Sequence, residues 1–356
     1  MIERHGWSVP ATYGDVLLEY AAVREGGAGL IDLSPRGRIL VSGSEAIQFL
    51  NGLITNDMKT LEVNSWMAAA FPNVQGRLIA SARVTRLADE TTNQRISPAF
   101  LLDTEAGTRE RVLKTIERFT LAGDFRVRDI TEETVLLTVQ GRLAARIVRA
   151  AIGDAAGEPG RHAASQTVWG QSGLTVLRAT HTGEDGFDLI VEMVQAADLW
   201  AALQNAGARP VGYDALEMLR IEAGQPRYGV DMDETNVVTE APLDEAVSFT
   251  KGCYIGQEII ARIKYRGHVA KKLAGIRFTQ AAKVEVGSVI KSADDKEIGR
   301  VTSATFSPHL GHTIAMGYLK YDYLAPETSV TVVSGDKELP GKSTELPFVK
   351  GSWWRE

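Results

Sequence analysis

The sequence lacks the features that mark several large classes of protein. One cysteine among 356 residues excludes an intramolecular disulfide and any cluster site made of several cysteines of one chain. No run of about 18 apolar residues predicts a membrane span, and the N-terminus has no apolar run of signal-peptide length. Acidic residues outnumber basic ones by 45 to 39, which argues against nucleic-acid binding through a basic surface. These absences predict a cytoplasmic protein with no membrane or nucleic-acid partner.

Several widespread catalytic motifs are also missing. The sequence has no Walker loop, no Gly-x-Gly-x-x-Gly followed by a suitable acidic residue, and no Gly-x-Ser-x-Gly elbow. Its histidines show no metal-ligand grouping, so no metal site is predicted. The six are His5, His162, His181, His268, His309 and His312. The function therefore has to be sought in less general motifs.

The composition is that of a folded protein with more than one core. Apolar residues make up 44% and charged residues 24% of the chain, and its length exceeds what one core usually serves. Strand and helix patterns mix up to about residue 270, which predicts an α+β fold. Beyond that point short apolar runs alternate with turn residues, which predicts an all-β sandwich or barrel. We expect domains at residues 1–270 and 271–356.

Local patterns predict several elements that bear on function. Residues 66–71 and 78–87 are strand candidates on either side of a Pro-Asn-Val-Gln-Gly turn, so a hairpin is expected there. Ser44 is expected to cap a helix that runs to Leu53, and Asp214 a helix that runs to Ala223.

The segment Lys251–Glu258 (Lys-Gly-Cys-Tyr-Ile-Gly-Gln-Glu) holds the one cysteine, Cys253. A nearby cation and a helix N-terminus both favour the reactive thiolate. Lys251 and a helix that starts near Ile255 are candidates for these two roles. A free cysteine is equally often a small buried hydrophobe, so the spacing alone leaves both interpretations open.

Three other segments carry candidate polar groups. Glu184, in the turn Thr182–Gly186, can present a carboxylate to a heterocycle or belong to a solvated acidic turn. Arg220 and Glu222 are two residues apart on a predicted helix and cannot face each other. Each contacts a different group or lies on the surface. Asn73 lies at the tip of the predicted hairpin, where the simplest interpretation is a turn.

Taken together, these segments resemble a known family. Lys251–Glu258, followed by Ala261-Arg262 and Tyr265–Gly267, is similar to the signature of the YgfZ family of folate-binding proteins, which assist iron–sulfur cluster assembly or repair. The resemblance spans nearly the whole chain. The other segments that agree with this family are Asp57, Asn73 to Arg77, Thr182 to Gly186, Arg220 to Pro226, Gly229, Asp231 and Glu240-Ala241.

The resemblance implies a fold and a set of site residues. That family is similar to the glycine-cleavage T-protein, an aminomethyltransferase that uses tetrahydrofolate. The likeness implies interleaved subdomains around a central folate channel, with roughly residues 55–130 inserted, and a C-terminal β-barrel. Tetrahydrofolate is the implied cofactor, and iron–sulfur client or assembly proteins are the implied partners. Cys253 and Lys251 are the implied working residues, and the implied folate contacts are Glu184, Asn73, Arg220, Tyr254 and Gln257.

One difference from the T-protein distinguishes between two candidate functions of this chain. The T-protein carries an essential aspartate on the hairpin, whereas the matching stretch here, which includes Ala80 and Ser81, has no carboxylate. The first hypothesis is therefore a folate-binding accessory protein for iron–sulfur clusters, with Cys253 as its thiol. The alternative is a folate-dependent aminomethyltransferase or demethylase, and a binding module without folate is a third.

Overall fold

The structure is a computed structural model that describes residues 1–92, 95–118, 120, 123–153, 160–279 and 281–354. Its α-helices within these ranges are α1 (Val16–Arg24), α2 (Ala46–Leu53), α3 (Arg109–Glu117), α4 (Ala144–Ile152), α5 (Ala196–Asn205), α6 (Tyr213–Glu222) and α7 (Gln257–Arg266). Short 3₁₀ helices lie at Ala106–Thr108, Met193–Gln195, Val238–Glu240, Asp244–Ala246, Tyr321–Tyr323 and Ser352–Trp354. No helix in these ranges is long and apolar enough to cross a membrane.

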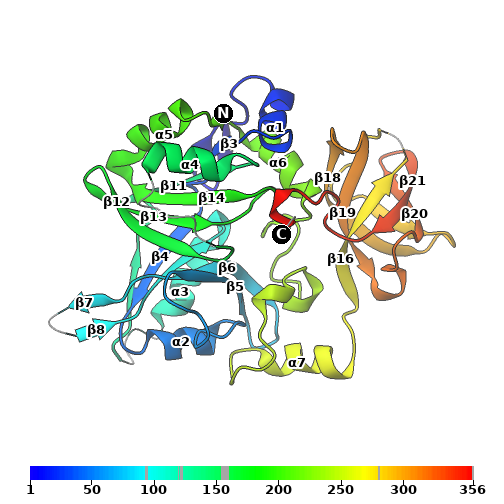
Figure 1. The fold of residues 1–356 in the computed structure, drawn as a ribbon. Coiled ribbons are helices and arrows are strands. Elements are labelled where there is room, and N and C mark those ends of the chain that lie inside the picture. The colour runs from blue at the N-terminus through cyan, green and yellow to red at the C-terminus, as the bar shows by residue number, and fades with distance from the viewer. Residues whose placement is uncertain (93–94, 119, 121–122, 154–159, 280, 355–356) are drawn as a thin grey trace.

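Two sheets form the N-terminal part of the molecule (Figure 1). The first has the order β10 (Arg126–Asp129), β4 (Gly37–Ser42), β9 (Ala99–Thr104), β6 (Leu78–Arg86) and β5 (Ser65–Pro72). The second has the order β12 (Ala164–Trp169), β13 (Ser172–Arg178), β14 (Gly186–Glu192), β11 (Thr134–Gln140), β3 (Gly29–Asp32) and β15 (Arg209–Pro210). Two-stranded ribbons are formed by β1 (Ile2–Arg4) with β2 (Trp7–Val9) and by β7 (Glu90–Thr92) with β8 (Arg95–Ser97).

The chain order interleaves the two sheets. All strands of the first sheet lie between Gly37 and Asp129 in sequence, so this segment is inserted between β3 and β11 of the second sheet. The predicted insertion of roughly residues 55–130 covers most of it. The mixture of sheets and helices confirms the predicted α+β class, and β5 and β6 pair as the predicted antiparallel hairpin.

A closed barrel forms the C-terminal part, which confirms the all-β prediction. Its order is β16 (Lys271–Phe278), β19 (His312–Lys320), β18 (Glu297–Ser307), β17 (Val289–Ser292), β20 (Ser329–Ser334) and β21 (Lys337–Thr344). Its strands enclose a separate apolar cluster that includes Ile276, Ile290 and Val332. After β21 the chain returns to the second sheet, where Trp353 donates its backbone N–H to the carbonyl of Gly183.

Helices cover the outer faces of the two sheets (Figure 1). The apolar faces of α4 and α5 pack on the second sheet in one core cluster, and those of α2 and α3 pack on the first sheet in another. A third cluster joins the inner faces of both sheets to α1 and α6. Because α6 also contacts β18 and β19 of the barrel, it lies where the three parts meet.

Two predicted helix caps are wrong. The α2 helix begins at Ala46, and Ser44 instead donates its N–H and Oγ–H to the carboxylate of Asp124. The α6 helix begins at Tyr213, so Asp214 lies in its first turn and Gly212 holds the cap position. An acidic residue in the first turn still favours the helix, because the N-terminus carries partial positive charge.

Candidate functional site

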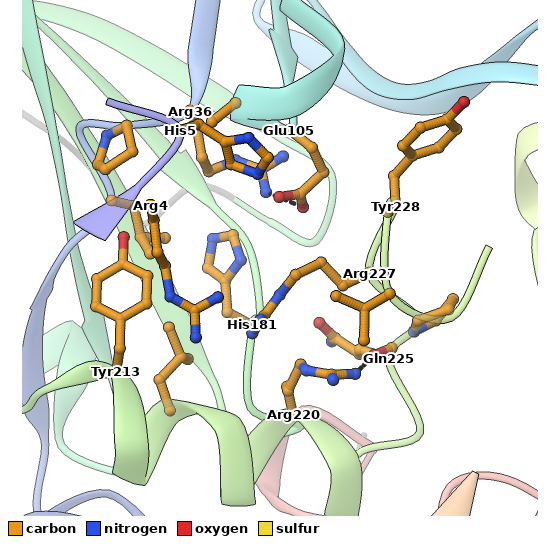
Figure 2. A pocket seen from close by; sticks show the side chains of 17 residues that line it. Arg4, His5, Arg36, Glu105, His181, Tyr213, Arg220, Gln225, Arg227 and Tyr228 are labelled. Carbon is orange, nitrogen blue, oxygen red and sulfur yellow. Dashed lines mark hydrogen bonds and ion pairs between the residues drawn. The ribbon is translucent and has the colours of Figure 1, made fainter. Parts of the chain in front are cut away.

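A cavity of about 160 Å³ lies where α6 meets the first β-ribbon and the loop that follows α6. Figure 2 shows charged side chains from these distant segments directed towards it. The charged and imidazole side chains that line it are Arg4, His5, Arg36, Glu105, His181, Arg220 and Arg227. We call this the arginine cavity. Glu105 is the one carboxylate among its described lining residues.

Glu105 enters the arginine cavity directly after strand β9. Arg36 Nη1 donates to Glu105 Oε1 at 2.6 Å, and Arg36 Nε donates to Asp103 Oδ1 at 2.7 Å. Although burial opposes it, Arg36 and Arg227 hold the pKa of Glu105 below its ordinary value. Glu105 is therefore an ionised hydrogen-bond acceptor at neutral pH.

Arg220 forms the opposite wall and connects it to the barrel. It is 4% exposed, its Nη1 donates to Asp231 Oδ2 at 2.7 Å, and its Nη2 donates to Ser303 Oγ at 2.7 Å and to Glu217. Asp231 also accepts from Ser303 at 2.7 Å. The interpretation of Arg220 as a surface charge is therefore wrong, because it pairs with a buried carboxylate.

His181 links the arginine cavity to a buried carboxylate on the second sheet. Its Nε2 lies 3.0 Å from each oxygen of Asp188, and Arg83 of the first sheet donates to the same carboxylate. Burial opposes ionisation, but His181 and Arg83 hold the pKa of Asp188 well below its usual range. This ion cluster joins the two sheets, and it leaves Asp188 ionised.

Glu184 lies in a different environment from the one predicted for a solvated turn. It is 6% exposed, and Arg24 Nη1 donates to its Oε1 at 2.5 Å. Ser352 near the C-terminus donates its N–H and Oγ–H to Oε2 at 2.7 and 2.6 Å. Glu222 on α6 accepts from the same arginine and from Tyr20, and it is fully buried. The structure therefore uses Glu184 and Glu222 to hold α1, α6 and the C-terminal segment together.

The Lys251–Glu258 segment forms a loop before α7. Cys253 is exposed and free, whereas Lys251 is 6% exposed. Lys251 Nζ donates to the backbone carbonyls of Asn51, Ile54 and Asn56 at 2.7, 2.9 and 2.6 Å. Burial lowers the pKa of Lys251 to about 8. Lys251 therefore binds the carbonyls at the C-terminal end of α2, while the thiol two residues later faces solvent.

The remaining predicted residues gather near this loop. Tyr254 is 8% exposed and belongs to a small apolar cluster with Tyr228, and Gln257 donates to the Lys251 carbonyl at 3.4 Å. Asn73 Oδ1 accepts from the N–H groups of residues 75 and 77 and so stabilises the hairpin turn. Of the seven predicted site residues, only Arg220 lines the arginine cavity.

The hairpin position without a carboxylate lies beside Glu105. Ala80 is buried in the core under α2 and α3, and the backbone carbonyl of Ser81 accepts from Thr104 Oγ1 at 2.8 Å. Since Ala82 pairs with Thr104 in the antiparallel register, Glu105 comes next to Ser81 on the neighbouring strand. The first sheet thus offers a carboxylate here, at the end of β9 rather than on β6.

Sequence reasoning missed most of the arginine cavity. Arg4, Arg36, Glu105 and Arg227 come from separate segments, and the first three stand in no motif that predicts a site. His181 and Arg227 adjoin segments that carried the family resemblance, and this was the only available signal. Within the described ranges, no group of three or more His, Cys, Asp or Glu residues could hold a metal ion.

Comparison with known proteins assigns the family. The GCVT N-terminal domain matches residues 1–251, and the glycine cleavage T-protein C-terminal barrel domain matches residues 271–350. The chain belongs to the glycine-cleavage T-protein family. Tetrahydrofolate, the predicted cofactor, is the one that this family uses.

Relatives of this T-protein family member match it along nearly its whole length. A protein of Rubrobacter xylanophilus named aminomethyltransferase is 31% identical over 98% of this chain and 90% of its own length. Another of that name, from Symbiobacterium thermophilum, is 32% identical over 98% and 93%. The crystal structure of glycine cleavage system aminomethyltransferase T from Bartonella henselae has a TM-score of 0.87 and 26% identity, and it covers 98% of this chain and 93% of that chain. These names favour the alternative function over the iron–sulfur hypothesis.

Proposed function

We propose that this protein binds tetrahydrofolate in the arginine cavity and acts as a folate-dependent aminomethyltransferase or demethylase. The observation that carries the proposal is the similarity of the whole chain to proteins named aminomethyltransferase, with 31% identity over 98% of its length. Both sheets and the barrel are included in that similarity, so every part that surrounds the cavity is shared.

The donor and acceptor groups of the arginine cavity suit a folate. The pterin ring presents N–H donors, and an ionised carboxylate is their strongest acceptor. Glu105 is such a group, and it lies beside the hairpin position where the T-protein carries its aspartate. When bound, tetrahydrofolate would supply the nitrogen that accepts a one-carbon unit. Glu105 would orient the ligand, and Arg36 would keep Glu105 ionised.

The test is calorimetric titration of the full chain with tetrahydrofolate, followed by a turnover assay. We expect binding, and we expect turnover of a methylated glycine or of an aminomethyl carrier protein. Glu105→Gln keeps the size of the side chain and removes its charge, so it should weaken binding by at least about tenfold. Glu110→Gln, on an exposed surface pair with Lys114, is the matched control. No binding by the native chain would refute the proposal.

A second candidate function has its own support. The exposed free thiol of Cys253 and the uncharged residues at positions 80 and 81 favour a folate-binding accessory protein for iron–sulfur clusters. One cysteine cannot hold a cluster alone, so the thiol would act as a transient ligand, as a redox group or as a contact with a client or assembly protein.

The second candidate function predicts an effect on iron–sulfur enzymes in cells that does not depend on turnover of a folate substrate. In cells that lack the native protein, Cys253→Ala should fail to restore the activity of iron–sulfur enzymes. Gly252→Ala is the neighbouring control, and it should restore that activity because a Cβ at this position meets nothing within 4 Å. Full rescue by Cys253→Ala would exclude a working role for the thiol. If the native protein turns over a folate substrate and Cys253→Ala fully restores iron–sulfur enzyme activity, the aminomethyltransferase function is the one candidate that remains.

A further inference from the structure

The lining of the arginine cavity has a charge opposite to that of the whole protein. The chain has a net charge of −6, yet the described residues that line the cavity supply four guanidinium groups and one carboxylate. Figure 2 shows Arg4, Arg220 and Arg227 entering it from different sides. Guanidinium groups that converge on one space repel one another unless anions lie between them.

Three of the four arginines already have carboxylate partners. Arg36 pairs with Asp103 and Glu105, and Arg220 pairs with Asp231 and Glu217. Among the described residues, Arg227 forms its ion pair with Glu217 alone, the carboxylate that Arg220 also uses. Burial, and next the charge of Arg220, lower the pKa of Arg227, and Arg4 adds to this effect. Arg227 therefore shares the carboxylate of Glu217 with a second arginine.

Arg4 has no carboxylate partner among the residues that the structure describes. Its Nε is buried without a hydrogen-bond partner, and its guanidinium carbon lies 5.0 Å from the centre of the Tyr213 ring. The ring fixes one face of the guanidinium, so the N–H groups at its edge stay free for an acceptor. A buried donor without a partner is costly, and a ligand oxygen would remove that cost.

We propose that the arginine cavity is a binding site for an oxyanion, a carboxylate or a phosphate group, which Arg4 and Arg227 bind. A guanidinium binds both groups through two parallel N–H donors. Two sources share this chemistry: the carboxylates of the glutamyl tail of a folate, and free phosphate. The first source rests on the proposed function, and the second does not.

The experiment is calorimetric titration of the full chain with three probes. They are tetrahydrofolate, tetrahydropteroate (which lacks the glutamyl tail) and inorganic phosphate alone. Arg4→Gln removes the charge, Arg4→Lys keeps it without the fork, and Arg128→Gln is the control on an exposed pair with Glu133. Thermal unfolding of each variant confirms that it is folded.

We expect native protein to bind tetrahydrofolate at least about tenfold more tightly than tetrahydropteroate, because the pteroate lacks the two glutamyl carboxylates, and the one carboxylate that it keeps, on the benzoate ring, lies closer to the pterin than those of the tail. Arg4→Gln should abolish this difference, Arg4→Lys should keep part of it, and Arg128→Gln should keep all of it. Binding of phosphate alone, lost in Arg4→Gln, would support the site with phosphate as the source, even if no folate binds. Equal affinity for both folates with no phosphate binding would overturn the inference and leave the proposed function intact. If no probe binds, both fail.

Discussion

The arginine cavity and the Lys251–Glu258 loop show opposite relations between sequence and space. The cavity brings together side chains from distant segments, such as Arg4 and Arg227. In the loop, neighbours in sequence separate: Lys251 points inwards to three carbonyls, Cys253 is exposed, and Tyr254 packs in an apolar cluster. Residues that are neighbours in a sequence motif therefore do not always form one site in space, and a chemical site can form where no motif marks it.

The largest difference in stability is expected between variants of two arginines of the arginine cavity, Arg220 with its carboxylate partners and Arg4 without one among the described residues. Arg220→Met leaves Asp231 buried without its cation, so it should lower the free energy of unfolding by about 3–5 kcal/mol. Arg4→Met breaks no ion pair with a residue that the structure describes, and it should cost less than about 1 kcal/mol, the worth of its contact with Tyr213. Urea unfolding measures both. Similar costs for the two variants would show that the pairing of Arg220 has no special weight.

In the loop, Lys251 is expected to matter more for stability than Cys253. Lys251→Met removes three hydrogen bonds to buried carbonyls, so we expect a loss of about 2–3 kcal/mol in urea unfolding. A loss below that of an exposed lysine variant such as Lys114→Met, whose pair with Glu110 faces solvent, would contradict the structural role.

The same lysine predicts a dependence of stability on pH. Burial lowers the pKa of Lys251 from 10.5 to about 8. Between these values the unfolded chain keeps the proton that the folded chain has lost, so the stability of the native protein should rise as the pH increases through this window. Lys251→Met should lack this rise. Parallel stability curves for the two proteins across the same window would contradict it.

A pair of glycines tests how closely the loop packs on the hairpin. Gly256 has a φ of +78°, and a Cβ there would lie 2.3 Å from the Asn73 carbonyl oxygen, whereas a Cβ on Gly252 would meet nothing within 4 Å. Gly256→Ala should therefore cost about 1–2 kcal/mol from its backbone conformation alone. Gly252→Ala is the matched control. Equal unfolding midpoints would mean that the loop moves away from the hairpin at little cost.

The smallest effect on stability belongs to Cys253. Its side chain is exposed, so Cys253→Ser should change the free energy of unfolding by less than about 0.5 kcal/mol. Modification by a thiol reagent should be fast in the folded native protein. Slow modification until the protein unfolds would show that the thiol is covered in solution.

Much of the fold was predictable because it depends on local patterns. Two strand candidates on either side of the turn within residues 66–87 predicted the hairpin, and the short apolar runs separated by turn residues after residue 270 predicted the barrel, since strand and turn preferences act over a few residues. The two predicted helix caps were wrong because the folded structure places both residues elsewhere. Ser44 has a tertiary partner, Asp124, and Asp214 lies inside the helix because Gly212 holds the cap position.

The candidate site was predictable only in part. Arg220 was selected from the family resemblance and lines the arginine cavity. The roles of Cys253, Lys251, Glu184, Asn73, Tyr254 and Gln257 in function stay predictions. Glu105 had no sequence signal, because its importance depends on the register that places it beside Ser81.

The relation to the T-protein, the α+β class with its all-β C-terminal part and the single free thiol could all be read from the sequence, because they follow from composition, local pattern and long motifs. Which charges are buried together could be read only from the folded molecule. Arg4 and Arg227 meet because the first β-ribbon and the loop after α6 border the same cavity, and Lys251 turns away from Cys253 to reach the end of α2. Charge interactions act through space, and the folded backbone sets the distances over which they act.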